Sequence, residues 1–303
     1  MGSLEGGFEG GSQGGSGAAG SAFPSEANCT ICPHRCRLEP GKTGVCGVRS
    51  VQDGKVTSQN YGLSSGLALD PIEKKPLACF KPGSFILSYG SFGCNMRCPF
   101  CQNASISTAS AAKPVSSSSI SPEALVGKAL SLRARGNIGI ALTYNEPLIA
   151  WEYLMDCAAR AREAGLVMAI VTNGYACKET WEETLPWLDA ANIDLKSFSE
   201  EGYRSLGAPG GLETVKHSIA SAYEAGIHVE VTTLVVPGFS DDEEAFKEQC
   251  LWLAALCPEI PLHITRFFPC HKMLDRPPTP LKTLKRFQEI AGEYLERVFV
   301  GNV

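Results

Sequence analysis

The sequence predicts an α/β fold, a partial (β/α)6-type barrel that follows an N-terminal cysteine-rich segment. Short apolar runs without polar alternation recur along the chain, as expected for strands that are covered on both faces. Helical patterns lie between them, and several have capping residues, such as Ser121-Pro122 before the first helix, Gly136 after it and Gly165 after the next. Strand–helix repeats of this kind indicate a parallel sheet with right-handed crossovers.

The expected elements alternate from residue 85 to the end of the chain. Seven strands are expected, at residues 85–89, 138–143, 167–172, 191–195, 228–235, 262–267 and 297–300. Six helices are expected, at residues 122–134, 148–164, 179–185, 212–225, 241–256 and 281–296. Active sites of such barrels lie at the carboxyl ends of the strands. Polar motifs follow these ends at residues 94–101, 143–147, 172–174 and 194–196, so we expect them to meet on one side of the barrel.

Composition divides the chain into three parts and limits its function. We expect residues 1–23 to be a disordered Gly/Ser-rich lead, residues 24–83 to be a Cys-rich segment with a connector, and residues 84–303 to be the barrel. The net charge of −5 argues against a nucleic-acid partner, and no apolar run is long enough to span a membrane. Thirteen cysteines without an export signal indicate metal binding in a reducing compartment, so we expect a cytoplasmic protein without a disulfide framework.

The most informative motif is C-x3-C-x2-C at Cys94, Cys98 and Cys101, shortly after the first expected strand. Three thiolates can hold three irons of a [4Fe-4S] cluster, which leaves the fourth iron free for a cofactor. This arrangement is typical of enzymes that cleave S-adenosylmethionine (AdoMet) to form a radical. A zinc site is the alternative, but it needs a fourth ligand, and no other Cys or His lies between Cys79 and Cys157.

With this motif and several others, the chain resembles the pyruvate formate-lyase activating enzyme-like radical AdoMet (radical SAM) proteins, in particular the branch known as the AmmeMemoRadiSam system radical SAM enzyme. The resemblance implies a TIM-like radical SAM barrel that binds a [4Fe-4S] cluster and AdoMet. The residues that carry it are the cysteine motif and residues 29–36, 44–49, 70–77, 143–147, 194–198 and 235–238.

The resemblance also implies roles for individual residues. Cys94, Cys98 and Cys101 are expected to ligate the cluster, and Glu146 is expected to accept hydrogen bonds from the methionine ammonium group of AdoMet. The other residues expected to bind AdoMet are Asn145, Thr172, Asn173, Asp194, Lys196 and, at the far side of the cofactor, His263. Structural alternatives stay open: Glu146 can begin a helix, Asp194 and Lys196 can form a salt bridge, and His263 can be a core histidine.

Four upstream cysteines form a second pattern, C-x2-C-x3-C-x9-C, at Cys29, Cys32, Cys36 and Cys46. Four thiolates in a short segment with little apolar core are typical of a metal site that supplies folding energy. Zinc and an auxiliary iron–sulfur cluster are both compatible with the pattern. The alternative is a mobile arm with free thiols.

These features predict a radical AdoMet oxidoreductase that receives an electron from a donor such as flavodoxin or ferredoxin. Its substrate is a small molecule or a peptide in one hypothesis, and the backbone glycine of a glycyl-radical enzyme in another. A third hypothesis, from a different class, is a metal-binding partner protein without catalysis. Arg266, Lys272 and Arg276 lie in or near the sixth expected strand, where they either bind an anionic substrate or form a solvated basic rim.

Overall fold

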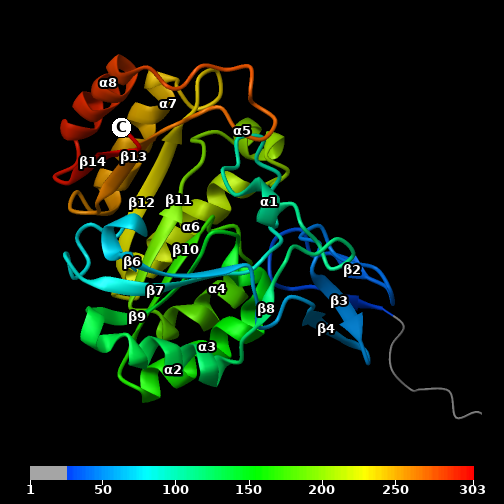
Figure 1. Cartoon of the computed structure of the whole chain (residues 1–303). Coiled ribbons are helices and arrows are strands. Elements are labelled where there is room, and N and C mark those ends of the chain that lie inside the picture. The colour runs from blue at the N-terminus through cyan, green and yellow to red at the C-terminus, as the bar shows by residue number, and fades with distance from the viewer. Residues whose placement is uncertain (1–25) are drawn as a thin grey trace, which may run out of the picture.

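The computed structural model describes residues 26–303, and the expected disordered lead at residues 1–23 lies outside this range. An eight-stranded sheet forms the centre of the fold, in the order β14-β13-β12-β11-β10-β9-β7-β6 (Figure 1). Its strands are β6 (Gly66–Pro71), β7 (Phe85–Gly90), β9 (Asn137–Thr143), β10 (Val167–Thr172), β11 (Ala190–Asp194), β12 (His228–Val235), β13 (Leu262–Arg266) and β14 (Val298–Gly301). All neighbours are parallel except β6 and β7, which are antiparallel. The α/β class, the partial barrel and the seven strands are confirmed, whereas β6 was not expected.

Six helices connect the strands close to their expected positions. They are α2 (Pro122–Ser131), α3 (Trp151–Glu163), α4 (Lys178–Thr184), α6 (Gly211–Glu224), α7 (Glu243–Leu256) and α8 (Leu281–Gly292). Shorter elements are α1 (Ala104–Ser107), α5 (Glu200–Ser205), η1 (Ile72–Lys74), η2 (Arg133–Arg135), η3 (Pro147–Ala150) and η4 (Leu185–Trp187). Local sequence explains the ends: the Ser121 hydroxyl accepts the Ala124 N–H at 3.2 Å before α2, and Gly136 takes a φ of 83° after η2. None of the helices within residues 26–303 has the length and apolar character needed to cross a membrane.

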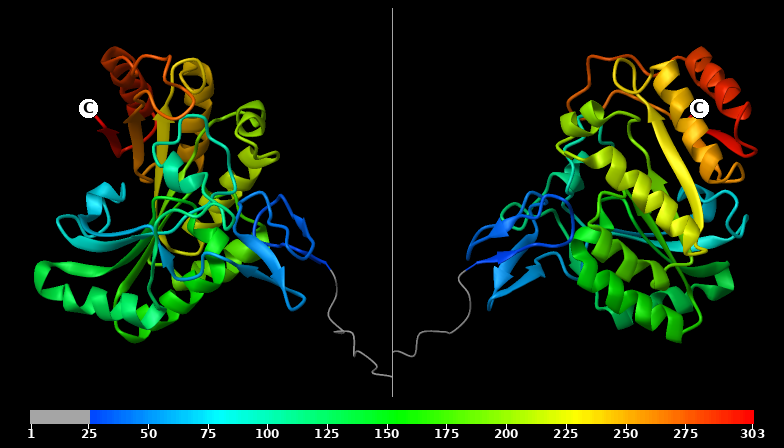
Figure 2. Two further views of the ribbon diagram at one scale, coloured as in Figure 1. Left: turned by 45° about the vertical axis from the view of Figure 1, so that its right-hand side comes forward. Right: turned by 180° about the vertical axis from the view of Figure 1, so that it is seen from behind.

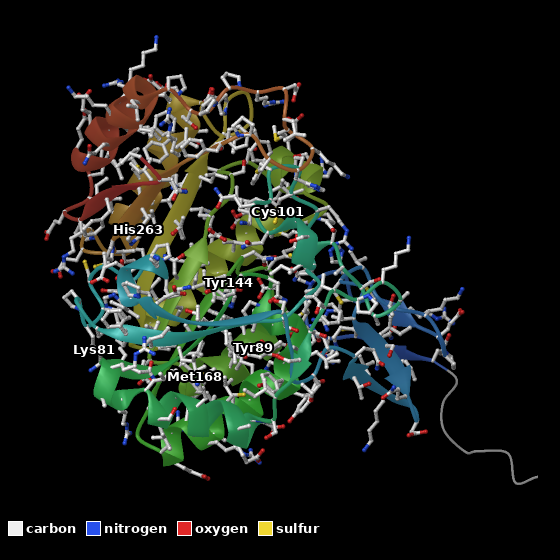
Figure 3. All side chains as sticks on the ribbon, viewed as in Figure 1. Lys81, Tyr89, Cys101, Tyr144, Met168 and His263 are labelled. Atoms are coloured by element: carbon white, nitrogen blue, oxygen red, sulfur yellow. The ribbon has the colours of Figure 1, made fainter. Side chains whose placement is uncertain are left out.

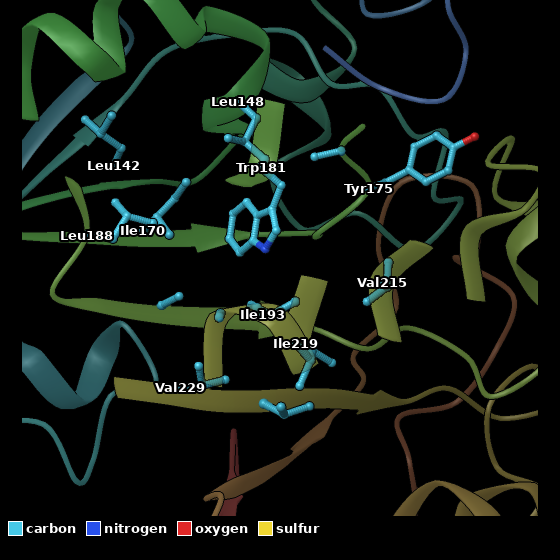
Figure 4. Close-up of a cluster of buried hydrophobic side chains, with 14 of the residues drawn as sticks. Leu142, Leu148, Ile170, Tyr175, Trp181, Leu188, Ile193, Val215, Ile219 and Val229 are labelled. Atoms are coloured by element: carbon cyan, nitrogen blue, oxygen red, sulfur yellow. The ribbon is translucent and has the colours of Figure 1, made fainter. Parts of the chain in front are cut away.

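The main hydrophobic core lies between the sheet and its helices (Figure 4). Ile170 of β10 and Ile193 of β11 pack in one cluster with Trp181 of α4 and Ile219 of α6, and all four are fully buried. Full burial of such a side chain stabilises the fold by about 1.5–3 kcal/mol. The Trp181 indole N–H donates to the Ser218 carbonyl at 3.0 Å, so its buried nitrogen has a partner. This packing fixes the helices that frame the carboxyl ends of the strands.

A second, smaller core joins the connector before β7 to the sheet. It consists of Ile72, Leu77, Ile86, Ala141, Ala169 and Ala190, all fully buried. The fully buried carboxylate of Glu230 on β12 holds the same connector, because it accepts the N–H groups of Ala78 at 3.0 Å and Cys79 at 2.8 Å. Burial raises the pKa of Glu230, but hydrogen bonds from His228, His263 and Cys79 outweigh it and lower the pKa to about 2. The connector is therefore fastened to the sheet by an ionised carboxylate.

Small hairpins precede the barrel and lie beside it (Figure 2). They are formed by β1 (Ala27–Asn28) with β2 (Arg37–Leu38) and by β3 (Arg49–Gln52) with β4 (Lys55–Ser58), and β5 (Leu63–Ser64) pairs with β8 (Ser118–Ser119). The buried guanidinium of Arg49 forms a bidentate ion pair with Glu152 of α3, with distances of 2.7 and 2.8 Å. This ion pair ties the cysteine-rich segment to the barrel.

Candidate active site

The three-cysteine loop follows β7 at the carboxyl end of the sheet. The thiols of Cys94, Cys98 and Cys101 are half-buried. Two backbone hydrogen bonds hold the loop, from Gly93 N–H to the Ile106 carbonyl at 2.9 Å and from Arg97 N–H to the Leu206 carbonyl at 2.8 Å. The loop is therefore shaped by the chain itself and presents three thiols beside the ends of the neighbouring strands.

Glu146 lies directly before η3, and its carboxylate is buried with only 2% of the residue exposed. One carboxylate oxygen accepts the Leu148 N–H at 3.0 Å and the Thr172 hydroxyl at 2.8 Å, and the other accepts the Asn173 N–H at 2.9 Å. Burial raises the pKa of Glu146 to about 7, although these donors lower it. A carboxylate has about four acceptor positions, so one remains for a further donor. The group is suited to bind a cation.

Asn145 and Tyr144 connect this turn to the cysteine loop and to β6. The Asn145 side chain accepts the Ser91 N–H at 3.0 Å and donates to the Gly93 carbonyl at 3.1 Å, so it holds both sides of the residues that lead into Cys94. Tyr144 has a φ of 72°, which is uncommon for a residue with a large side chain. The Asn103 side chain, two residues after Cys101, donates to the Tyr144 carbonyl at 2.8 Å, and Figure 3 labels both Tyr144 and Cys101.

Asn173 extends the contacts of Glu146 to the first cysteine. Its side-chain N–H donates to the Asn95 carbonyl oxygen Oδ1 at 2.9 Å and lies 3.7 Å from the Cys94 sulfur. Asn95 is fully buried, and its own amide donates to the Tyr175 carbonyl at 2.8 Å. The turn after β9, the end of β10 and the loop after β7 therefore form one hydrogen-bonded unit.

Asp194 and Lys196 form an ion pair at the end of β11, with 3.0 Å between the carboxylate oxygen and Nζ. Burial lowers the pKa of Lys196, but Asp194 and the thiols of Cys98 and Cys101 together raise it above its ordinary value. The ammonium therefore remains charged next to two of the three thiols. This charge is suited to balance thiolates that ligate a metal.

The structure does not bring His263 to this group. Its Nε2 lies 2.6 Å from a carboxylate oxygen of Glu230, and its ring stacks on Phe299 with centroids 5.1 Å apart. Both partners belong to neighbouring strands of the sheet, and Figure 3 shows His263 well apart from Cys101. His263 therefore has its contacts within the sheet, as expected for a core histidine.

The basic residues at the end of β13 and after it hold a loop in place. The Arg266 side chain donates to the Thr279 carbonyl at 2.8 Å, and Arg276 donates to the Pro237 carbonyl. The backbone N–H of Lys272 donates to the Pro99 carbonyl at 2.9 Å, so this loop lies against the cysteine loop. The two arginines are thus engaged in backbone contacts.

Sequence reasoning missed a polar group on β6 and η1. The Lys75 ammonium is 2.8 Å from the Asp70 carboxylate and 4.4 Å from the centre of the Tyr144 ring, and the Tyr144 hydroxyl donates to the same carboxylate at 2.8 Å. The buried Ser88 hydroxyl has no hydrogen-bond partner within residues 26–303. The only sequence signal was the motif at residues 70–77, for which no role was assigned.

The upstream cysteines lie in the hairpin segment, with Cys29, Cys32 and Cys46 buried and Cys36 half-buried. Burial is the main reason that the pKa of Cys32 is raised to about 12, and Cys29 and Cys46 raise it further, so the three thiols are neighbours. In the part of the chain that the structure describes, no three Cys, His, Asp or Glu side chains are gathered around the position of a single metal ion. This holds for both sets of cysteines. The ligating sulfurs of an iron–sulfur cube stand farther apart than those of a single ion, so three loop thiols beside a charged lysine still fit a cluster.

Comparisons with known proteins agree with this arrangement. Residues 89–250 match the Radical SAM superfamily. The chain is 37% identical over 281 residues to the uncharacterized protein MJ0808 of Methanocaldococcus jannaschii, which covers 92% of this chain and 82% of the relative. It is 25% identical over 158 residues to the pyruvate formate-lyase-activating enzyme of Clostridium pasteurianum, which covers 52% of this chain and 64% of that enzyme.

A solved structure supports the fold alone. The radical SAM methyltransferase from Sphaerobacter thermophilus has a TM-score of 0.53 at 15% identity and covers 73% of this chain and 67% of its own. Enzymes of the matched family use a [4Fe-4S] cluster and AdoMet, and the thiols and the buried carboxylate described above suit both groups. This chain belongs to the radical SAM superfamily, and over about half of its length it is similar to pyruvate formate-lyase-activating enzyme.

Proposed function

We propose that the chain is a radical AdoMet oxidoreductase in which Cys94, Cys98 and Cys101 hold the [4Fe-4S] cluster. When bound, the cluster supplies an electron that cleaves AdoMet to methionine and a 5′-deoxyadenosyl radical, which removes a hydrogen atom from the substrate. The observation that carries the proposal is the continuous set of hydrogen bonds from the Cys94 loop through Asn95 and Asn173 to Glu146. These contacts hold three thiols and one buried carboxylate in a fixed relation.

Glu146 is the proposed partner of the methionine ammonium group of AdoMet. Its remaining acceptor position can take an N–H donor, and a cation next to it offsets the burial that raises its pKa to about 7. Thr172 and Asn173 then act by orienting this carboxylate, since both donate to it. Asn145 acts by holding the approach to Cys94.

Asp194 and Lys196 are proposed to bind the rest of the cofactor. A carboxylate such as Asp194 can accept the ribose hydroxyls, and the Lys196 ammonium can bind the methionine carboxylate while it balances the charge of the thiolates. We do not include His263 among the residues proposed to bind AdoMet, because its ring nitrogen Nε2 contacts Glu230. The site is thus proposed to use three thiols and six other side chains.

The test is the formation of 5′-deoxyadenosine by the anaerobically reconstituted chain with a reductant. Cys98→Ala is expected to abolish this product, and Glu146→Gln is expected to weaken AdoMet binding roughly 10- to 100-fold, which corresponds to the loss of a charged hydrogen bond. Cys250→Ala is the matched control, because that thiol is buried in α7 outside the site. Product formation that is unchanged in Cys98→Ala would refute the assigned cluster ligands. A wild-type chain that forms no product would favour the non-catalytic partner protein.

A second candidate function is activation of a glycyl-radical enzyme. It is favoured by the similarity to the pyruvate formate-lyase-activating enzyme of Clostridium pasteurianum, which extends over about half of this chain. The substrate would then be a backbone glycine, and the electron would come from a donor such as flavodoxin or ferredoxin. A doublet EPR signal in a candidate glycyl-radical partner, dependent on this chain and AdoMet, is the expected result. Turnover of a small molecule or peptide without that signal would favour the first hypothesis.

A further inference from the structure

The four upstream cysteines form a compact group that the proposed AdoMet reaction does not use. Cys29 and Cys46 lie close enough to Cys32 to raise the pKa of its thiol, and Cys29 also raises the pKa of Cys46. Cys36 belongs to the same hairpin, since its carbonyl accepts the Cys29 N–H at 2.9 Å. Four thiols within 18 residues are thus held near one another in a segment with little core of its own.

A backbone N–H group points at one of these sulfurs in the way one does at the first cluster cysteine. The Cys94 sulfur accepts the Met96 N–H at 3.4 Å. The Cys36 sulfur accepts the Val45 N–H at 3.4 Å. Such donors stabilise a thiolate over a thiol and are common around metal-bound sulfur.

Arg49 supplies a buried positive charge beside the same thiols. Only 4% of this residue is exposed, and Cys29 and Cys46 lie near enough to raise the pKa of its guanidinium. Its two terminal nitrogens bind Glu152, but its buried Nε has no hydrogen-bond partner among residues 26–303. An unpartnered N–H of this kind is costly unless an acceptor completes the site. A cluster ligated by four thiolates carries net negative charge and provides acceptor sulfurs.

The group also touches the catalytic loop at two points on either side of Cys94. The Cys32 thiol contacts the side chain of Asn95. On the other side, a Cβ on Gly93 would lie only 2.8 Å from the Cys46 carbonyl oxygen, so the two cysteine segments are in backbone contact there. His34 adds a third contact, because its Nε2 is 2.9 Å from the Asn95 carbonyl.

We propose that Cys29, Cys32, Cys36 and Cys46 bind a second iron–sulfur cluster, which packs against the loop that holds the first and stiffens it. The four thiols are neighbours but are not gathered around a single-ion position, as is also true of the three loop thiols. Four thiolates can hold all four irons of such a cluster, and zinc is the competing occupant that the test below distinguishes. Each thiol loses its proton on ligation, and Arg49 offsets part of the resulting negative charge.

The test measures metal without relying on catalysis. The full chain with Cys94→Ala, Cys98→Ala and Cys101→Ala is reconstituted anaerobically with iron and sulfide, in the presence of zinc. About four irons and four sulfides per chain should remain, with the visible absorption and Mössbauer signature of a cluster. Adding Cys29→Ala and Cys32→Ala should remove them, whereas adding Cys250→Ala should not.

Three results would overturn the proposal: no iron in the triple variant, zinc in its place, or iron that persists without Cys29 and Cys32. Asn95→Ala in the triple variant tests the contact with the loop. Because its amide touches Cys32, the EPR spectrum of the reduced second cluster should change, and an unchanged spectrum would exclude the proposed contact. None of these readouts depends on AdoMet cleavage, so they separate this proposal from the proposed function.

Discussion

Replacing Glu146 with Gln should change how the stability of the chain depends on pH. The pKa of this buried carboxyl is about 7 in the folded chain, against an ordinary value of 4.5. The folded state therefore holds the proton more tightly than the unfolded state. The stability that protonated Glu146 contributes is fully present below about pH 4.5 and is lost as the pH rises through about 7. At about 1.4 kcal/mol for each pKa unit, the loss amounts to about 3 kcal/mol.

The assay is urea denaturation of wild-type and Glu146→Gln chains without cluster or AdoMet, from about pH 4 to about pH 8. Gln replaces the oxygen that accepts the Asn173 N–H by an NH2 group, so the variant carries a constant penalty of about 1–3 kcal/mol. Because this penalty does not change with pH, the free energy of unfolding of the wild type should fall by about 3 kcal/mol more than that of the variant as the pH rises. The exposed Glu183→Gln is the control and should follow the wild type. Equal slopes for Glu146→Gln and wild type would refute a buried titrating carboxyl at this position.

Three further substitutions test the contacts around the site, each by the free energy of unfolding. Lys75→Met breaks the buried ion pair with Asp70 and should destabilise the chain by about 3 kcal/mol. The control Lys74→Met, at an exposed position, should stay within about 0.5 kcal/mol of wild type. Equal effects of the two substitutions would contradict the ion pair. Glu230→Gln should lower the free energy of unfolding by about 3 kcal/mol at neutral pH, because the folded-state pKa of Glu230 is lowered to about 2. The difference between wild type and variant should shrink as the pH falls from about 4.5 toward about 2, and a constant difference would argue against an ionised carboxylate. Gly90→Ala places a Cβ only 2.6 Å from the Tyr144 ring and should destabilise by about 1–3 kcal/mol, and an unchanged stability would show that the ring moves freely.

Local sequence predicted the strands well, and the polar residues expected at their carboxyl ends lie there. The apolar runs that became β9, β10 and β11 are buried along nearly their whole length, as unalternated runs require. Because these strands are parallel and adjacent, their carboxyl ends meet, and the residues that follow them meet as well. Glu146, Asn173 and Lys196 could therefore be assigned to one site before any contact was known.

Contacts that depend on strand register could not be predicted in this way. His263 is engaged by Glu230, which is 33 residues away in sequence and on the neighbouring strand, and nothing local signals that pair. The antiparallel strand β6 contains Gly, Asp and Pro and has no fully buried residue, so it has no clear strand pattern. Its Asp70 reaches Tyr144 only because β6 pairs with β7 at the edge of the sheet. Both features arise from pairing between distant segments.

The loop that enters Cys94 is held by side-chain amides on both sides, and this choice of residue has a physical reason. Asn145 accepts from Ser91 and donates to Gly93, while Asn95 accepts from Asn173 and donates to the Tyr175 carbonyl. Only a group that both donates and accepts can satisfy an N–H and a carbonyl at once, and a carboxylate cannot donate. An acid here would also add negative charge beside Glu146 and thiolates, which raises the energy of each of them. Neutral amides thus order the loop before any metal is bound. Metal binding then does not have to offset the conformational entropy lost on ordering the loop.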